Sequence, residues 1–166
     1  LEPGEAIFMK SGMLHAYLHG VGVEIMANSD NVLRGGLTSK HIDVPELMHV
    51  VQFDALLDPI APAENVVLSS HGIVPAEGIE TVEYLTPVPE FRLSRSHLAP
   101  CRESHLGIEG PFIVLVTEGT VTLTSRECPE GLSVSAGHAA WVGAWEDRPT
   151  IATGENSATV FIARVP

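Results

Sequence analysis

The sequence has few cysteines, few basic residues and no long apolar run. Only Cys101 and Cys128 are present among 166 residues, and neither lies in a spacing typical of a metal site. A disulfide framework and a zinc ribbon are therefore not indicated, and a reducing compartment is expected. No stretch approaches the ~20 apolar residues that cross a bilayer, and the first residues lack the pattern of a signal peptide. These features predict a soluble, cytoplasmic chain.

Positive charge is also scarce. Nine Lys and Arg residues stand against 21 Asp and Glu residues, which gives a formal net charge of -12. Such a field repels the phosphates of nucleic acids and the anionic head groups of lipids, so neither is an expected partner. An anionic substrate such as a sugar phosphate would need a local cluster of cations on this acidic surface, which makes the position of each Arg and Lys informative.

The apolar residues occur in short runs that are rich in Val, Ile, Leu and Thr, with Gly and Pro scattered between them. This pattern is typical of an all-β fold with many strands joined by turns. We expect a hairpin that turns at Glu118 and Gly119, a first strand of that hairpin buried on both faces, and a closing pair formed by the last two strands. The predicted strands cover residues 6–9, 21–27, 66–68, 82–84, 91–98, 112–116, 121–124, 132–134, 139–142, 150–152 and 158–163.

One short helix is predicted around residues 44–52. Asp43 has the side chain of an N-cap, Pro45 falls in the first turn, and Glu46 follows as an acidic first-turn residue. A Pro-rich linker at residues 59–62 ends this region. We therefore expect two parts, residues 1–58 and residues 59–166.

A weak internal similarity relates residues 4–18 to residues 131–145. Each segment has an apolar run, a loop with Gly and a nearby His, and an aromatic-bearing run. The similarity suggests two related β-barrel halves. In the second half, His138, Trp141 and Trp145 have no acidic or His partners, so we interpret them as packing residues.

The residue types that carry chemistry are concentrated at residues 15–40, which read HAYLHGVGVEIMANSDNVLRGGLTSK. This run resembles the second signature of the type I mannose-6-phosphate isomerases: His-Ala-Tyr-aliphatic, Glu-x-Met-Ala-x-Ser-Asp-Asn, and Arg-Ala-Gly-x-Thr-Pro-Lys. The sequence departs from the family at Gly35, where Ala is usual, at Ser39, where Pro is usual, and at residues 13–14, where Thr-Pro is frequent. The resemblance implies a mainly β fold of cupin, or jelly-roll, barrel halves and identifies the chain as the C-terminal portion of such an enzyme. It implies that residues 1–58 are the C-terminal part of the catalytic cupin barrel with its connecting helix, and that residues 59–166 are a C-terminal cupin-like barrel domain.

The resemblance also implies roles for five residues. His15 corresponds to a zinc ligand, and Arg34 to the catalytic arginine, whose guanidinium suits a phosphate or a developing enediolate. Tyr17, Glu24 and Lys40 are candidates for binding substrate. The family's Gln, His and Glu zinc ligands have no counterpart in this sequence, so zinc belongs to the complete enzyme and this chain alone is expected to be inactive.

Each residue also has an ordinary structural interpretation. A lone His is more often a hydrogen-bonded surface residue than a ligand, and Arg34 and Lys40 are also compatible with solvated cations or partners of Asp30 and Asp43. Tyr17 also fits simple packing with a tethered hydroxyl. Further histidines without a family role, which we interpret as surface residues, are His19, His41 and His49.

The resemblance implies a zinc-dependent aldose–ketose isomerase that interconverts mannose 6-phosphate and fructose 6-phosphate. Its expected partners are the sugar phosphate and the missing N-terminal portion of the same enzyme. The alternative is a cupin-type binding or structural module without a complete metal site. A self-contained cupin dioxygenase or epimerase ranks last, because it needs a His-x-His and Glu motif that the sequence lacks.

Overall fold

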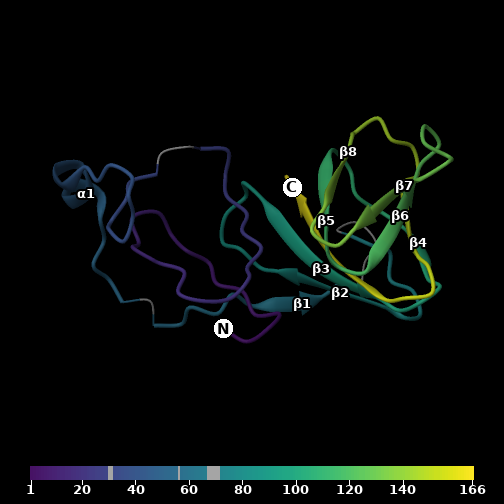
Figure 1. Cartoon of the computed structure of the whole chain (residues 1–166), viewed down its shortest axis with the longest axis horizontal. Helices are drawn as coiled ribbons and strands as arrows, with labels where there is room; N and C mark the ends of the chain where they lie inside the picture. The colour runs from purple at the N-terminus through teal and green to yellow at the C-terminus, as the bar shows by residue number, and fades with distance from the viewer. Residues whose placement is uncertain (30–31, 56, 67–71) are drawn as a thin grey trace. The chain divides into compact units, whose positions relative to one another are not determined.

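The computed structural model describes the chain except for residues 30, 31, 56 and 67–71. The chain forms two compact units, Leu1–Ala61 and Pro62–Pro166. The first unit contains the helix α1 (Val44–Val50), and the second contains all ten strands that the described residues form (Figure 1). The assignment of residues 1–58 to a catalytic barrel and of residues 59–166 to a second barrel stays a prediction.

The second unit consists of two antiparallel sheets. Six strands form one sheet in the order β1-β2-β3-β10-β5-β8, and four form the other in the order β4-β9-β6-β7. The strands are β1 (Ala63–Asn65), β2 (Ile79–Tyr84), β3 (Arg92–Leu98), β4 (Glu103–His105), β5 (Phe112–Glu118), β6 (Thr120–Thr124), β7 (Leu132–Ser135), β8 (Ala139–Val142), β9 (Thr150–Thr153) and β10 (Ala158–Arg164).

The inner faces of the two sheets share one apolar core. Phe112, Val114 and Val116 of β5 belong to the same buried cluster as Val121 and Leu123 of β6, which lie in the opposite sheet. Alternate residues along these strands point inward, as the period of a strand requires. The predicted mainly β, cupin-like jelly-roll fold with one short helix is thus confirmed, although the sheets of the described residues do not close into a barrel.

The predicted hairpin at Gly119 is wrong, because β5 and β6 lie in different sheets. Gly119 has φ of 73°, and a Cβ built on it would collide with the carbonyl oxygen of Ser157. The turn therefore takes the chain around a crowded corner from one sheet to the other. The predicted closing pair is also wrong, since β9 pairs with β4 and β6, whereas β10 pairs with β3 and β5.

Two predictions of burial in the second unit are also wrong. Strand β5 is not buried on both faces, because Ile113 is 41% exposed and alternates with buried neighbours. Trp141 and Trp145 are 60% and 71% exposed, so neither packs in the core. Trp141 pairs with Ile113 on the outer face of the six-stranded sheet, and the ring of Trp145 lies against the backbone of Gly143.

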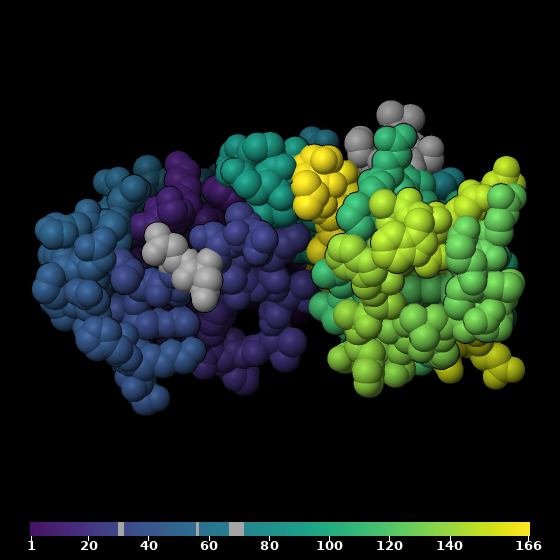
Figure 2. All heavy atoms as spheres, turned by 90° about the horizontal axis from the view of Figure 1, so that it is seen from above, coloured from purple at the N-terminus to yellow at the C-terminus, as the bar shows by residue number. Residues whose placement is uncertain are grey.

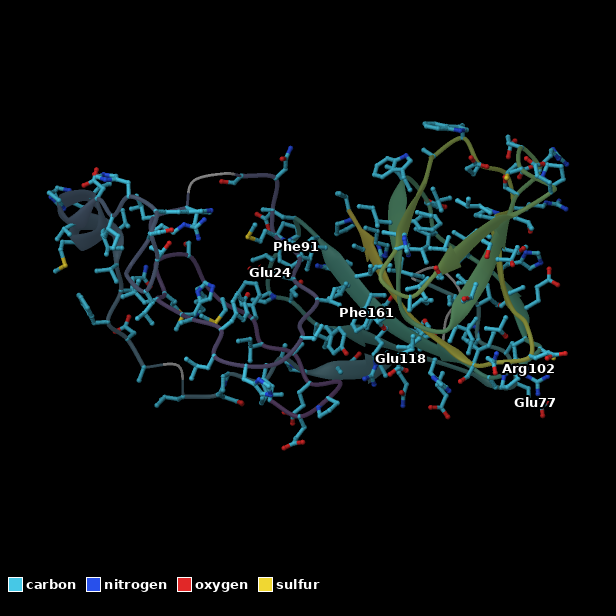
Figure 3. All side chains as sticks on the ribbon, in the orientation of Figure 1. Glu24, Glu77, Phe91, Arg102, Glu118 and Phe161 are labelled. Carbon is cyan, nitrogen blue, oxygen red and sulfur yellow. The ribbon has the colours of Figure 1, made fainter. Side chains whose placement is uncertain are left out.

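At the turn before β2, a long polar side chain lies against the backbone of a glycine. Gly78 has φ of 77°, and a Cβ there would lie 2.5 Å from Nε of Arg102. Figure 3 shows Arg102 beside Glu77, the residue that precedes this glycine. The Nε atom of Arg102 is buried and has no hydrogen-bond partner among the described residues.

In the first unit, the predicted helix is confirmed and the two predicted strands are not. The side chain of Asp43 caps α1 by accepting a hydrogen bond from the backbone N–H of Glu46 at 3.0 Å. Residues 6–9 contribute only an isolated bridge between Ile7 and Ile60, and residues 21–27 form no strand. Alternation alone cannot make a strand where no neighbouring strand supplies hydrogen bonds. No helix of the described residues is long and apolar enough to span a membrane.

The first unit has almost no core of its own. Among its described residues only Ala61 is buried, and Figure 2 shows an opening between its purple and dark blue atoms. Many large apolar side chains are exposed instead: Leu1, Ile7, Leu14, Tyr17, Leu18, Val21, Met26, Val32, Leu37, Val44, Met48, Val50, Phe53, Leu57 and Ile60. A folded domain normally buries such side chains, so their exposure in this unit is unusual.

Candidate functional site

His15 lies on an exposed loop whose start is fixed by backbone contacts. The carbonyl oxygen of Gly12 accepts a hydrogen bond of 2.8 Å from the N–H of Gln52, and Met13 forms a parallel bridge with Gln52. Nδ1 of His15 lies 3.4 Å from the carbonyl oxygen of Met13. In the tautomer that donates this hydrogen bond, Nε2 keeps a free lone pair, as in metal-ligating histidines.

Tyr17 and Glu24 are brought together beside His15. The rings of His15 and Tyr17 meet edge to face with centroids 5.8 Å apart. The partial burial of the Tyr17 hydroxyl, followed by the charge and the hydrogen bond of the Glu24 carboxylate, raises the pKa of Tyr17. Glu24 is labelled in Figure 3 on the irregular segment of the first unit. Three of the predicted site residues thus form one polar cluster.

The loop that carries Arg34 lies against the residue that precedes His15. A Cβ built on Gly35 would lie 2.6 Å from Cδ2 of Leu14, so Gly35 and Leu14 are in direct contact. Arg34 precedes Gly35 in the chain, and His15 follows Leu14. Each of these two site residues is therefore adjacent in sequence to one side of the contact. Arg34 is exposed, and the described residues provide it with no ion pair.

Of the predicted site residues, Lys40 has a side chain whose position is least fixed by contacts. Its side chain is exposed and has no partner among the described residues, while its backbone N–H donates to Oγ1 of Thr38 at 3.1 Å. Asp43 accepts the N–H of Glu46, not a cation. Asp30, the other carboxylate considered as a partner, lies outside the described residues.

The described residues do not by themselves fit a zinc ion. No group of three or more His, Cys, Asp or Glu side chains among them is placed to hold a metal. His15 offers one imidazole, whereas a catalytic zinc site takes three protein ligands. The core of the second unit offers none, since the side chains of its buried cluster are apolar.

The role of Gln52 was not predicted, because the sequence around it reads as the end of a helix. It follows α1 directly and pairs with Met13, so it fixes the backbone that precedes His15. A backbone pairing of this kind leaves no signature in side-chain type. The surface interpretation is confirmed for His19, His41 and His49, which are all exposed, and His49 lies 3.7 Å from Glu46.

The two antiparallel sheets of the second unit define a class, that of jelly-roll proteins of the cupin type. Among solved structures, two single-residue mutants of phosphomannose isomerase from Salmonella typhimurium match this chain. The mutant in which a lysine is replaced by alanine has a TM-score of 0.56 at 27% identity and covers 84% of this chain. The mutant in which a histidine is replaced by alanine has a TM-score of 0.57 at 30% identity and covers 81% of it. The chain spans 32% and 31% of these proteins.

Sequence comparison gives the particular family. The mannose-6-phosphate isomerase of Salmonella typhimurium is 37% identical over 93% of this chain, and that of Escherichia coli is 35% identical over 97%. The one from Aspergillus fumigatus is 34% identical over 98%. By sequence this chain therefore belongs to the mannose-6-phosphate isomerase family, which confirms the resemblance. It spans only 36–38% of the length of these relatives. No family model matches the chain.

Proposed function

We propose that this chain contributes part of the active site of a cytoplasmic, zinc-dependent isomerase that interconverts mannose 6-phosphate and fructose 6-phosphate. The observation that carries the proposal is the cluster of His15, Tyr17 and Glu24, with the Arg34 loop in contact beside it. The relatives of the chain are named for the isomerisation of mannose 6-phosphate, which gives the reaction.

Each residue of the cluster has a chemical role in this proposal. The guanidinium of Arg34 stabilises the negative charge that builds on an enediolate as a proton moves between neighbouring carbons of the sugar. Tyr17 and Glu24 hydrogen-bond substrate hydroxyls, and Lys40 supplies a second cation for the phosphate. The imidazole of His15 provides one zinc ligand, and the remaining ligands come from outside these residues.

The proposed partner is a further polypeptide portion that belongs to the same enzyme. The exposed apolar side chains of the first unit support it, because each fully buried Leu, Val, Ile or Met contributes roughly 1.5–3 kcal/mol relative to exposure. The relatives are long enough to contain such a portion, since this chain spans little more than a third of their length. Without the portion, we expect the chain to be inactive.

A coupled isomerase assay with zinc analysis tests the proposal. The 166-residue chain is assayed beside the protein that carries it at full length, each with mannose 6-phosphate and each analysed for bound zinc. Activity and about one zinc per molecule are expected only at full length. A full-length protein that holds zinc but does not isomerise mannose 6-phosphate would defeat the proposal.

The second candidate function is a cupin-type binding or structural module. The observation that favours it is the absence of a metal-binding group among the described residues. The same assay separates the two functions, because a module of this kind leaves the full-length protein without zinc and without isomerase activity.

A further inference from the structure

The second unit contains an open cavity of about 320 Å³ that none of the proposed site residues lines. The described residues around it are His105, Leu106, Arg148 and Pro149. Strand β4 ends at His105, which pairs with Thr150 of β9, and the N–H of Leu106 donates to the carbonyl oxygen of Pro149 at 2.9 Å. This pairing fixes the backbone on both sides of the cavity.

The cavity wall combines two basic side chains with two apolar ones, and no carboxylate is among its described residues. Acidic residues outnumber basic residues by more than two to one in this chain, so such a wall is unusual. The described residues provide neither His105 nor Arg148 with a side-chain hydrogen bond or ion pair. The two basic groups are therefore available to a ligand.

The acidic residues that precede Arg148 have other partners. The carboxylate of Asp147 lies 2.7 Å from the guanidinium of Arg126, and Glu146 accepts a hydrogen bond from the hydroxyl of Ser125. These contacts hold both carboxylates on the loop that follows β6. The two carboxylates that precede Arg148 in the sequence are therefore engaged elsewhere and do not pair with its guanidinium.

The backbone of Arg148 is in an uncommon conformation. Its φ is 52°, in the left-handed region that side chains other than those of Gly, Asn and Asp rarely occupy. Such a conformation is strained, and outliers of this kind gather at ligand sites. Here it places an arginine, where a glycine would be unstrained, at the edge of the cavity.

From these observations we propose that His105 and Arg148 form a binding site for a small oxyanion, of the class of phosphate and phosphomonoesters. A guanidinium presents paired N–H donors that match two oxygens of a phosphate, and an imidazole supplies a further donor. The half-buried ring of Pro149 adds apolar surface beside these donors, which suits the carbon skeleton of a phosphomonoester.

An NMR titration of the 166-residue chain with inorganic phosphate at low ionic strength tests the proposal. The imidazole resonance of His105, assigned with the His105→Gln variant, should shift with saturation. Arg148→Gln should weaken binding about tenfold or more, since a charge-assisted hydrogen bond is lost. Arg148→Lys keeps the charge but loses the paired donors, so its affinity should lie between those of the unmodified chain and Arg148→Gln. Circular dichroism of both variants checks that they are folded.

The matched control is Lys10→Gln, which removes one positive charge from an exposed residue of the first unit. It should leave the affinity for phosphate unchanged to within about twofold, because Lys10 is not among the residues that line the cavity. Mannose 6-phosphate should compete with phosphate for the His105 resonance, whereas mannose, which lacks the phosphate, should not.

Three results would overturn the proposal: no saturable shift in the unmodified chain, equal affinity in Arg148→Gln, or competition by mannose as strong as that by mannose 6-phosphate. None of them bears on the isomerase proposal. The titration requires neither zinc nor the residues of the first unit, so the two proposals fail or stand separately.

Discussion

The hydroxyl of Tyr17 lies within the electrostatic reach of the carboxylate of Glu24, which together with partial burial raises its pKa, in a unit that has scarcely any core. This contact joins two segments of the family motif that no regular strand connects. Because the five predicted site residues of the motif are exposed, their arrangement depends on such local contacts, and each contact makes a measurable prediction.

The first prediction concerns the ionisation of Tyr17. Burial and Glu24 raise its pKa above the usual value of 10.0, so the hydrogen bond is fully present below pH 10 and is lost as the pH rises through the raised value. Glu24→Gln should lower this pKa and bring phenolate absorbance to lower pH. The measurement uses a Tyr84→Phe background, because Tyr84 is the second tyrosine and burial raises its pKa too.

Glu2→Gln is the control for this titration, since it removes an exposed carboxylate from the same unit. It should leave the Tyr17 titration where it was. Equal titration curves for Glu24→Gln and the parent would refute the Tyr17–Glu24 contact.

The second prediction concerns Arg34 in the protein at full length. Arg34→Ala should lower kcat by roughly a hundredfold or more, because a positive charge facing the developing enediolate is lost, while bound zinc stays constant. Lys10→Ala, which removes an exposed cation elsewhere in the first unit, should leave kcat unchanged. Steady-state kinetics with zinc analysis checks both variants, and wild-type turnover in Arg34→Ala would eliminate the assigned role.

The third prediction contrasts a buried ion-pair network with an exposed pair. Glu83 lies 3.4 Å from Arg164 and 3.7 Å from Arg92, and the side chain of Arg164 is only 9% exposed. Glu83→Gln removes the carboxylate that contacts both guanidinium groups, so the free energy of unfolding should fall by about 2–4 kcal/mol.

The control is Asp147→Asn, which breaks the pair with Arg126. That pair is shorter, at 2.7 Å, but its side chains are 41% and 71% exposed. Its loss should cost less than about 1 kcal/mol because solvent screens it. Urea unfolding measures both variants, and the reverse order of costs would show that Glu83 is not a structural counter-ion.

The fourth prediction tests the corner between the two sheets. Gly119→Ala should destabilise the second unit by about 3 kcal/mol or more, because its Cβ meets backbone atoms of Ser157 and Ala158 that cannot rotate away. Gly137 has a similar φ of 82° but nothing within 4 Å of a built Cβ, so Gly137→Ala should cost only about 1 kcal/mol. Similar melting temperatures for the two variants would mean that the corner is not crowded.

The sequence located most strands of the second unit but not their partners. The apolar run at residues 112–116 predicts a strand, and the structure confirms that strand but not its predicted burial on both faces. Whether the chain folds back beside it or crosses to the other sheet depends on a turn of a few residues. Gly119 signals a turn in either case, so the distinction could not be read from residue type.

The exposure of Trp141 was missed for a related reason. A sequence pattern separates the two faces of a strand but does not say which face meets water. Large aromatic side chains are usually buried, and that expectation fails on the outer face where Trp141 pairs with Ile113. In the first unit, residues 21–27 alternate like a strand but have no neighbouring strand to complete it.

The nearly coreless state of Leu1–Ala61 has a consequence for how the chain unfolds. With only Ala61 buried among its described residues, little free energy protects the backbone amides of this unit from water. In deuterated solvent, its amides should exchange at rates near those of an unfolded peptide, while amides in the sheets of Pro62–Pro166 exchange slowly. Heating the chain should then give a single cooperative transition that belongs to the sheets, and the motif residues would contribute almost nothing to its enthalpy.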